Sequence, residues 1–148
     1  MLDVFEAFET ARCAVFVASP EKAELVRGNL QAAGVACVRD SDAEGRAKFE
    51  ERAVRVMICT DELARDGLTG CVVLHYDLSR DVKSYVSRIG AKSDAGSRCV
   101  SIAFVTSDEV WLLIKLETDL GRSVGELPAN MEALIEHVNR TRAGLENR

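Results

Sequence analysis

Short apolar runs alternate with amphipathic stretches along most of this 148-residue chain. The runs are almost entirely apolar, as expected for strands covered on both faces of a parallel sheet, and they occupy residues 13–18, 35–38, 56–59, 71–75 and 99–105. Apolar residues at helical spacing predict helices over residues 20–33, 43–49, 81–89, 108–120 and 131–142. This alternation predicts a doubly wound, parallel α/β sheet with helices on both faces.

Local signals indicate where the elements begin and end. Ser19, followed by Pro20 and Glu21, is a strong helix start, and Gly34 is expected to end that helix. Residues 1–12 are predicted to form a helical lead-in, residues 13–143 a single domain and residues 144–148 a tail.

Composition narrows the class of protein. A hydrophobic content of 47% and a charged content of 29% are typical of a folded globular domain. We expect an intracellular protein, cytoplasmic or nuclear, with no membrane partner, because no apolar run has the length of a membrane span and no signal peptide is evident. Five cysteines without a CxxC pair argue against a disulfide framework or a zinc site. The net charge of −5 disfavours an extended nucleic-acid surface.

One candidate for enzymatic chemistry is Cys59, which stands six residues before Arg65 at the end of a predicted strand. Cysteine phosphatases and sulfurtransferases use this spacing to wrap a loop around an oxyanion. Asp61 and Glu62 lie inside that loop and would disfavour both a thiolate and a bound phosphate. We therefore predict no catalytic residue and keep a Cys-x5-Arg enzyme as the weakest alternative.

Other candidate sites are weaker still. The loop at residues 90–97, with Lys92 or Arg98, has small residues suited to holding a phosphate, but no GxxxxGK[ST] or GxGxxG pattern occurs. An ordinary connection is the better interpretation. His75 and His137 have no partner at metal-ligand spacing, so no metal is expected. Trp111 is predicted to lie in the core and not to stack on bases.

An ordered set of segments resembles the C-terminal RecA-like domain of DEAD-box RNA helicases. The segments are AVFVAS (14–19), RVMICTDELAR (55–65), VVLHYDLS (72–79), SYVSRIG (84–90), SIAFVTSDE (101–109) and GELP (125–128). They resemble, in order, the opening strand, the T-D-x-x-A-R-G-x-D segment, the V-I-N-Y-D-x-P strand, the Y-x-H-R-x-G segment, and the final strand, helix and tail. Together they span about residues 13–135 and imply a RecA-like fold.

The resemblance also implies a function, because the family binds ATP and RNA between two RecA-like domains. Only the second is present, so the chain is not expected to be an autonomous ATPase. ATP and Mg²⁺ are expected as cofactors only if it pairs with a first RecA-like domain. The matching positions imply nucleotide-cleft remnants at Arg65, Gly67, Arg88 and Gly90, and RNA-facing candidates at Ser19, Thr60 and Asp61.

Departures from the family pattern fall on charged positions. In the family's H-R-x-G-R-x-G-R segment the later two arginines act on the γ-phosphate, and here Ala91 and Asp94 stand in their places, although Arg88 keeps the first arginine. Loss of such an arginine finger removes roughly 10³–10⁵ in rate. Leu68 stands where the family has an acid near the ribose, and Asp66 replaces a glycine.

Acidic residues also enter the predicted ligand surface. The family's H-G-D turn near the RNA backbone reads Arg39-Asp40-Ser41 here. Asp40, Asp66 and Asp94 are therefore expected to face the place where a polyanion would lie. Arg65 and Arg88 are expected to pair inside the domain, with Asp61 or Asp77.

Two main hypotheses follow. In the first, the chain is a degenerate helicase half that binds a protein partner and has lost ATP hydrolysis, with RNA as a disfavoured second partner. In the alternative, it is a working half that completes an ATP and RNA cleft with a first RecA-like domain elsewhere. A phosphatase or sulfurtransferase built on Cys59 is the third.

Overall fold

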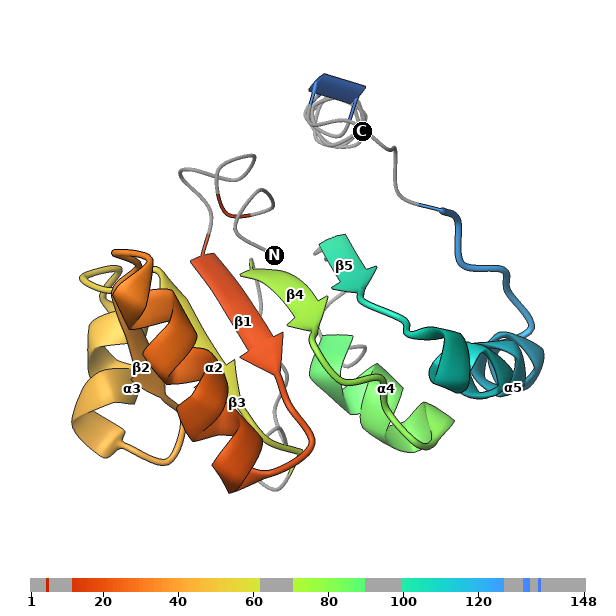
Figure 1. Cartoon of the computed structure of the whole chain (residues 1–148), viewed down its shortest axis with the longest axis horizontal. Coiled ribbons are helices and arrows are strands. Elements are labelled where there is room, and N and C mark those ends of the chain that lie inside the picture. The colour runs from red at the N-terminus through yellow and green to blue at the C-terminus, as the bar shows by residue number, and fades with distance from the viewer. Residues whose placement is uncertain are drawn as a thin grey trace. The chain divides into compact units, whose positions relative to one another are not determined.

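The computed structural model of the chain describes residues 5, 12–61, 71–89, 100–126, 132, 133 and 136. Two compact units make up the chain: Arg12–Ser123, and Met1–Ala11 together with Val124–Arg148. All described strands belong to the first unit (Figure 1). The predicted boundaries of lead-in, domain and tail remain predictions, and the helix predicted over 131–142 lies mostly outside the described residues. No described helix combines the length and apolar character needed to cross a membrane.

Five parallel strands form one sheet in the order β2-β3-β1-β4-β5, which confirms the predicted α/β fold class. The strands are β1 (Arg12–Phe16), β2 (Cys37–Arg39), β3 (Val56–Cys59), β4 (Cys71–His75) and β5 (Val100–Ala103). The central strand β1 lies between β3 and β4, so Phe16 has Cys59 on one side and His75 on the other. The carboxyl ends of all five strands therefore meet at one edge of the sheet (Figure 1).

Helices connect the strands close to where the sequence predicts them. They are α2 (Pro20–Ala32), α3 (Ala43–Glu50), α4 (Val82–Ile89), the short 3₁₀ helix η1 (Ser107–Glu109) and α5 (Val110–Leu120). Gly34, at φ 81°, ends α2 as predicted, since only glycine adopts this backbone without strain. The N–H of Val35 then donates to the carbonyl of Leu30, so the second strand begins at Cys37 and not at Val35.

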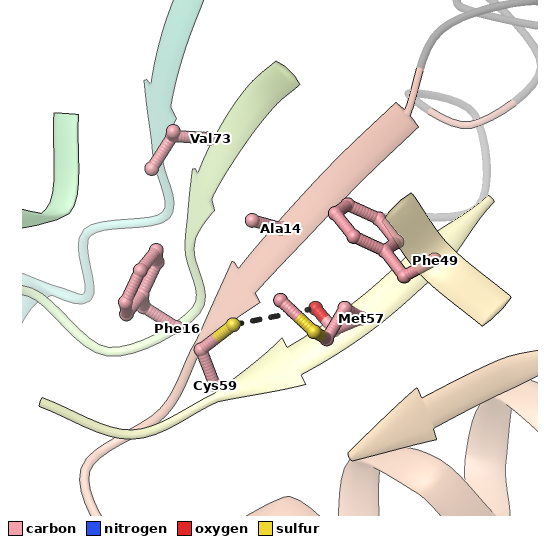
Figure 2. Close-up of a cluster of buried hydrophobic side chains, with 6 residues drawn as sticks. All are labelled: Ala14, Phe16, Phe49, Met57, Cys59 and Val73. Atoms are coloured by element: carbon pink, nitrogen blue, oxygen red, sulfur yellow. Dashed lines mark hydrogen bonds between the residues drawn. The ribbon is translucent and has the colours of Figure 1, made fainter. Parts of the chain in front are cut away.

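The core fills both faces of the sheet because alternate strand residues point in opposite directions. On one face a cluster joins three strands to Phe49 of α3, and Ile89 of α4 packs against it. Its buried members, drawn in Figure 2, are Ala14, Phe16, Phe49, Met57, Cys59 and Val73. Fully buried strand residues at the alternate positions, such as Val15, point to the opposite face of the sheet. A right-handed crossover from β1 to β2 places α2 on that opposite face. Helices thus cover both faces.

Helix α5 corrects one prediction made from the sequence. Leu112 and Leu116 are buried against Leu78, but Trp111 is 66% exposed and does not belong to the core. Neighbouring residues on a helix are about 100° apart, so Trp111 turns away from the side that Leu112 buries. An apolar residue type alone could not reveal this, because every residue from Val110 to Ile114 is apolar.

Two glycines offer a matched test of packing. A Cβ on Gly45 in α3 would lie 3.0 Å from the Val38 Cβ and 3.3 Å from the Arg39 carbonyl oxygen, whereas a Cβ on Gly28 in α2 meets nothing within 4 Å. We expect Gly45→Ala to lower the free energy of unfolding by about 1–3 kcal/mol through overpacking. Gly28→Ala should raise it by about 0.5–1 kcal/mol, because alanine favours helix. Urea denaturation measures both, and a gain at both positions would contradict the close contact at Gly45.

Candidate functional site

The carboxyl edge of the sheet gathers most of the described candidate residues. Ser19 follows β1, Thr60 and Asp61 follow β3, and Asp77 follows β4, and these three strands are neighbours. In open α/β sheets this edge is where ligands bind. What each side chain can offer a ligand depends on the bonds that it already makes inside the domain.

Arg88 of α4 is the most constrained of these candidates. Its side chain is 1% exposed, and it makes a two-pronged ion pair with Asp61: Nε lies 2.6 Å from Oδ1 and Nη2 lies 2.8 Å from Oδ2. Its Nη1 also donates to the carbonyl oxygen of Asp77 at 2.7 Å. The predicted pairing of Arg88 inside the domain is therefore confirmed. Its predicted role as a nucleotide-cleft remnant stays a prediction, and Nε, Nη1 and Nη2 each already donate to a protein atom.

His75 completes this buried cluster. Its Nδ1 lies 3.2 Å from Arg88 Nη1 and must accept, because a guanidinium has only donors. The ring proton therefore sits on Nε2, which donates to Ser101 Oγ at 2.8 Å. The imidazole stacks on Tyr85 with ring centroids 5.0 Å apart, and the Arg88 guanidinium lies 5.1 Å from the centroid of the Phe16 ring.

Burial lowers the pKa of His75 to about 3, helped by the positive charge of Arg88 and opposed by Asp61. The imidazole is therefore neutral at physiological pH. Among the described residues no group of three or more His, Cys, Asp or Glu side chains is arranged to hold a metal ion. His75 is a buried residue that hydrogen-bonds to Arg88 and Ser101.

Asp77 ties the end of β4 to the start of α2. Its Oδ2 accepts from the Ala18 N–H at 2.7 Å and its Oδ1 accepts from Lys22 Nζ. This hydrogen bond is the main reason that the pKa of Lys22 is raised. Ser19, predicted to face RNA, is the N-cap of α2, and its Oγ accepts from the Lys22 N–H at 3.2 Å. The Ser19 cap uses an oxygen lone pair and not the hydroxyl proton.

Asp40 does not face a polyanion, so this expectation from the sequence was wrong. The residue is 5% exposed and its Oδ2 accepts from the Thr60 N–H at 2.9 Å, which joins the ends of β2 and β3. Burial raises the pKa of Asp40, against the opposing effect of the Thr60 bond. Its Oδ1 has no hydrogen-bond partner among the described residues. Thr60, an RNA-facing candidate, is itself only 7% exposed, and its main-chain donor is taken.

Cys59 lies in the core and does not present a nucleophile. It is 2% exposed within the cluster shown in Figure 2, and its Sγ is 3.9 Å from the carbonyl oxygen of Met57. A reactive thiol needs access and a positive surrounding. The phosphatase or sulfurtransferase alternative is not favoured.

The remaining candidates lie outside the described residues. They are Arg65, Gly67, Gly90, Ala91, Lys92, Asp94 and Arg98, together with Asp66 and Leu68. Reasoning from the sequence missed Ser101 and Lys22 as partners of His75 and Asp77. The signal for Ser101 was a single hydroxyl in an otherwise apolar strand. Nothing local distinguished Lys22 from other surface lysines.

The buried ion pair predicts a large cost for losing Arg88. Arg88→Met keeps side-chain length but leaves Asp61, His75 and the Asp77 carbonyl without their shared donor. We expect the free energy of unfolding to fall by about 2–4 kcal/mol, less than for a fully buried pair because the Asp61 side chain is 42% exposed. As a control, Arg27→Ala removes an exposed pair with Glu24 and should cost less than about 1 kcal/mol. Equal losses in the two variants would contradict a structural role for the cluster.

The depressed pKa of His75 predicts a loss of stability in acid. Unfolding lets the imidazole take up a proton below its unfolded pKa of 6.5, so the stabilisation is complete above pH 6.5 and declines as pH falls toward 3. The decline should approach about 1.4 kcal/mol per pH unit from this group. His75→Asn removes the titrating group and should flatten the profile between pH 6.5 and 4. Parallel profiles of the two proteins in urea denaturation would refute the assignment.

Known proteins resemble this chain in both sequence and fold. No family model matches it. An ATP-dependent RNA helicase eIF4A of Chaetomium globosum is 30% identical over 142 residues, which cover 90% of this chain and 36% of the relative. The chain thus spans about a third of the length of that relative.

Solved structures extend the comparison. The structure of S. cerevisiae Dbp5 bound to RNA and ADP BeF3 has a TM-score of 0.70 and 17% identity to this chain. The match covers 98% of this chain and 40% of the Dbp5 chain. A variant C-terminal domain of Dbp5, bound to a Gle1 variant and IP6, has a TM-score of 0.67 and 21% identity, and the match covers 93% of this chain and 86% of that domain. The predicted resemblance is therefore confirmed: this chain carries a RecA-like domain homologous to the domains of DEAD-box RNA helicases.

Proposed function

We propose that this chain is a degenerate helicase half that binds a protein partner and does not support ATP hydrolysis. The observation that carries this proposal is that Ala91 and Asp94 stand where the family has its two γ-phosphate arginines. It is supported by the state of Arg88, whose guanidinium is 1% exposed and is bonded to Asp61, His75 and the Asp77 carbonyl. Of the three arginines in the family's H-R-x-G-R-x-G-R segment, this is the one that the chain retains. Its charge supports the fold and is not offered to a phosphate.

The other positions of the segment support the same conclusion. Ala91 supplies no charge and Asp94 would repel the γ-phosphate where the family places arginine fingers. Arg65, Gly67 and Gly90 remain candidate remnants of a nucleotide cleft. ATP and Mg²⁺ would be held only if a first RecA-like domain supplied the phosphate-binding loop.

RNA is a weaker candidate partner than a protein. The net charge is −5, and affinity for a phosphate backbone depends on lysine and arginine. Ser19, Thr60 and Asp61 are the remaining RNA-facing candidates, but Ser19 caps α2, Thr60 gives its N–H to Asp40 and Asp61 holds Arg88. A Dbp5 C-terminal domain has been solved bound to the protein Gle1, so a domain of this fold can serve as a docking module.

Reconstitution of the cleft tests this proposal. The chain is mixed with the isolated first RecA-like domain of an eIF4A helicase, single-stranded RNA and Mg²⁺-ATP, and phosphate release is measured. We expect no increase over the first domain alone, because the finger positions carry no positive charge. The matched variant Ala91→Arg/Asp94→Arg should increase turnover if the loss lies at those positions.

Two results would overturn the proposal in favour of a working helicase half. One is ATP turnover with the natural chain above that of the first domain alone. In this case Arg88→Lys, which keeps a charge, would lower turnover by more than its loss of folded protein explains. The other is tight binding to single-stranded RNA at moderate salt with a steep decline as salt rises, since that slope reports phosphate contacts.

A further inference from the structure

Three large apolar side chains of α5 are exposed to solvent. Val110 is 46%, Trp111 66% and Ile114 56% exposed. Val110 and Ile114 are four residues apart, and Trp111 and Ile114 are three apart, so the three lie side by side on one surface of the helix. We name this surface the α5 outer stripe.

The stripe is not a poorly packed part of the core, because the opposite side of α5 already has its partners. Leu112 and Leu116 are buried with Leu78, and Val82 and Tyr85 of α4 pack against them. Single exposed apolar residues such as Leu25 are ordinary. A contiguous group that contains a tryptophan is different, since tryptophan is enriched at the centres of protein interfaces.

Charges beside the stripe are mostly acidic. Between residues 108 and 119 the chain has four acids and one lysine. Asp108 is exposed three residues before Trp111, and Glu117 stands three residues after Ile114, so acids lie at both ends of the stripe. A partner suited to this surface would carry an apolar face bordered by lysine or arginine.

We propose that the α5 outer stripe docks a basic amphipathic helix of a partner protein. Helices recognise one another through apolar residues spaced three and four apart, which is the spacing the stripe presents. A second copy of this chain is a poorer occupant. Each copy has a net charge of −5 and acids beside the stripe, so two copies would repel each other electrostatically. This docking surface rests on the proposed role of the chain as a partner-binding module.

Trp111 provides a direct readout, because it is the sole tryptophan of the chain. Two synthetic helical peptides with the same leucine face are titrated into the full chain, one with lysines and one with glutamates on the polar face. We expect the lysine peptide to shift Trp111 emission to the blue as the indole leaves water, and the glutamate peptide to bind about tenfold or more weakly.

Two variants separate docking from damage to the fold. Ile114→Glu places a charge in the stripe and should weaken binding of the lysine peptide about tenfold or more, although glutamate is tolerated at an exposed helix position. Leu25→Glu makes the same change at a 57% exposed residue of α2 and should leave the affinity unchanged. Circular dichroism and urea denaturation should show all three proteins equally folded.

Several results would overturn the proposal. They are no shift with either peptide, equal binding of both peptides, equal weakening by Leu25→Glu, or a blue shift that grows with chain concentration alone and so indicates a second copy. Protection of Trp111 from acrylamide quenching in the free, dilute chain would show that another segment of the chain covers the stripe. None of these results bears on phosphate release, so this inference and the proposed loss of hydrolysis fail separately.

Discussion

A buried guanidinium holds the carboxyl edge of this sheet together. Arg88 reaches from α4 to Asp61 after β3 and to the carbonyl of Asp77 after β4, and it lies over the ring of Phe16 at the end of β1. Arginine cannot lose its charge inside a protein, so its burial is tolerated only where acceptors surround it. The ends of β3 and β4 supply those acceptors and β1 supplies the aromatic ring, so the arginine links the ends of the three central strands.

Burial of this charge occupies most of its hydrogen-bond donors. An arginine that assists phosphoryl transfer must keep donors free for the developing negative charge. Here Nε and both terminal nitrogens of Arg88 already donate to protein atoms. His75 contributes by staying neutral, since a second positive charge beside the guanidinium would destabilise the cluster. The edge where an α/β sheet usually binds its ligand is thus largely bonded to itself.

Hydrogen bonds within the domain also occupy other side chains along this edge of the sheet. Asp77 accepts from Ala18 and Lys22, and Asp40 accepts from Thr60. One exception is the Oδ1 of Asp40, which has no hydrogen-bond partner among the described residues. In α5, by contrast, one side fills the core while the other exposes Trp111. The described carboxyl edge is therefore bonded mostly within the domain, whereas α5 exposes large apolar side chains.

The sequence alone was sufficient for the fold and insufficient for the site. Short apolar runs, the Ser19 cap and Gly34 predict strands and helices directly, because periodicity and backbone preference act within a few residues. The direction in which a side chain points depends on segments distant in the chain. The tertiary structure decided that Arg88 meets Asp61 across 27 residues, that Asp40 is buried and accepts from the Thr60 N–H, and that Trp111 is turned outward. Charge burial and helix rotation follow from packing between elements, and packing exists only once the sheet has formed.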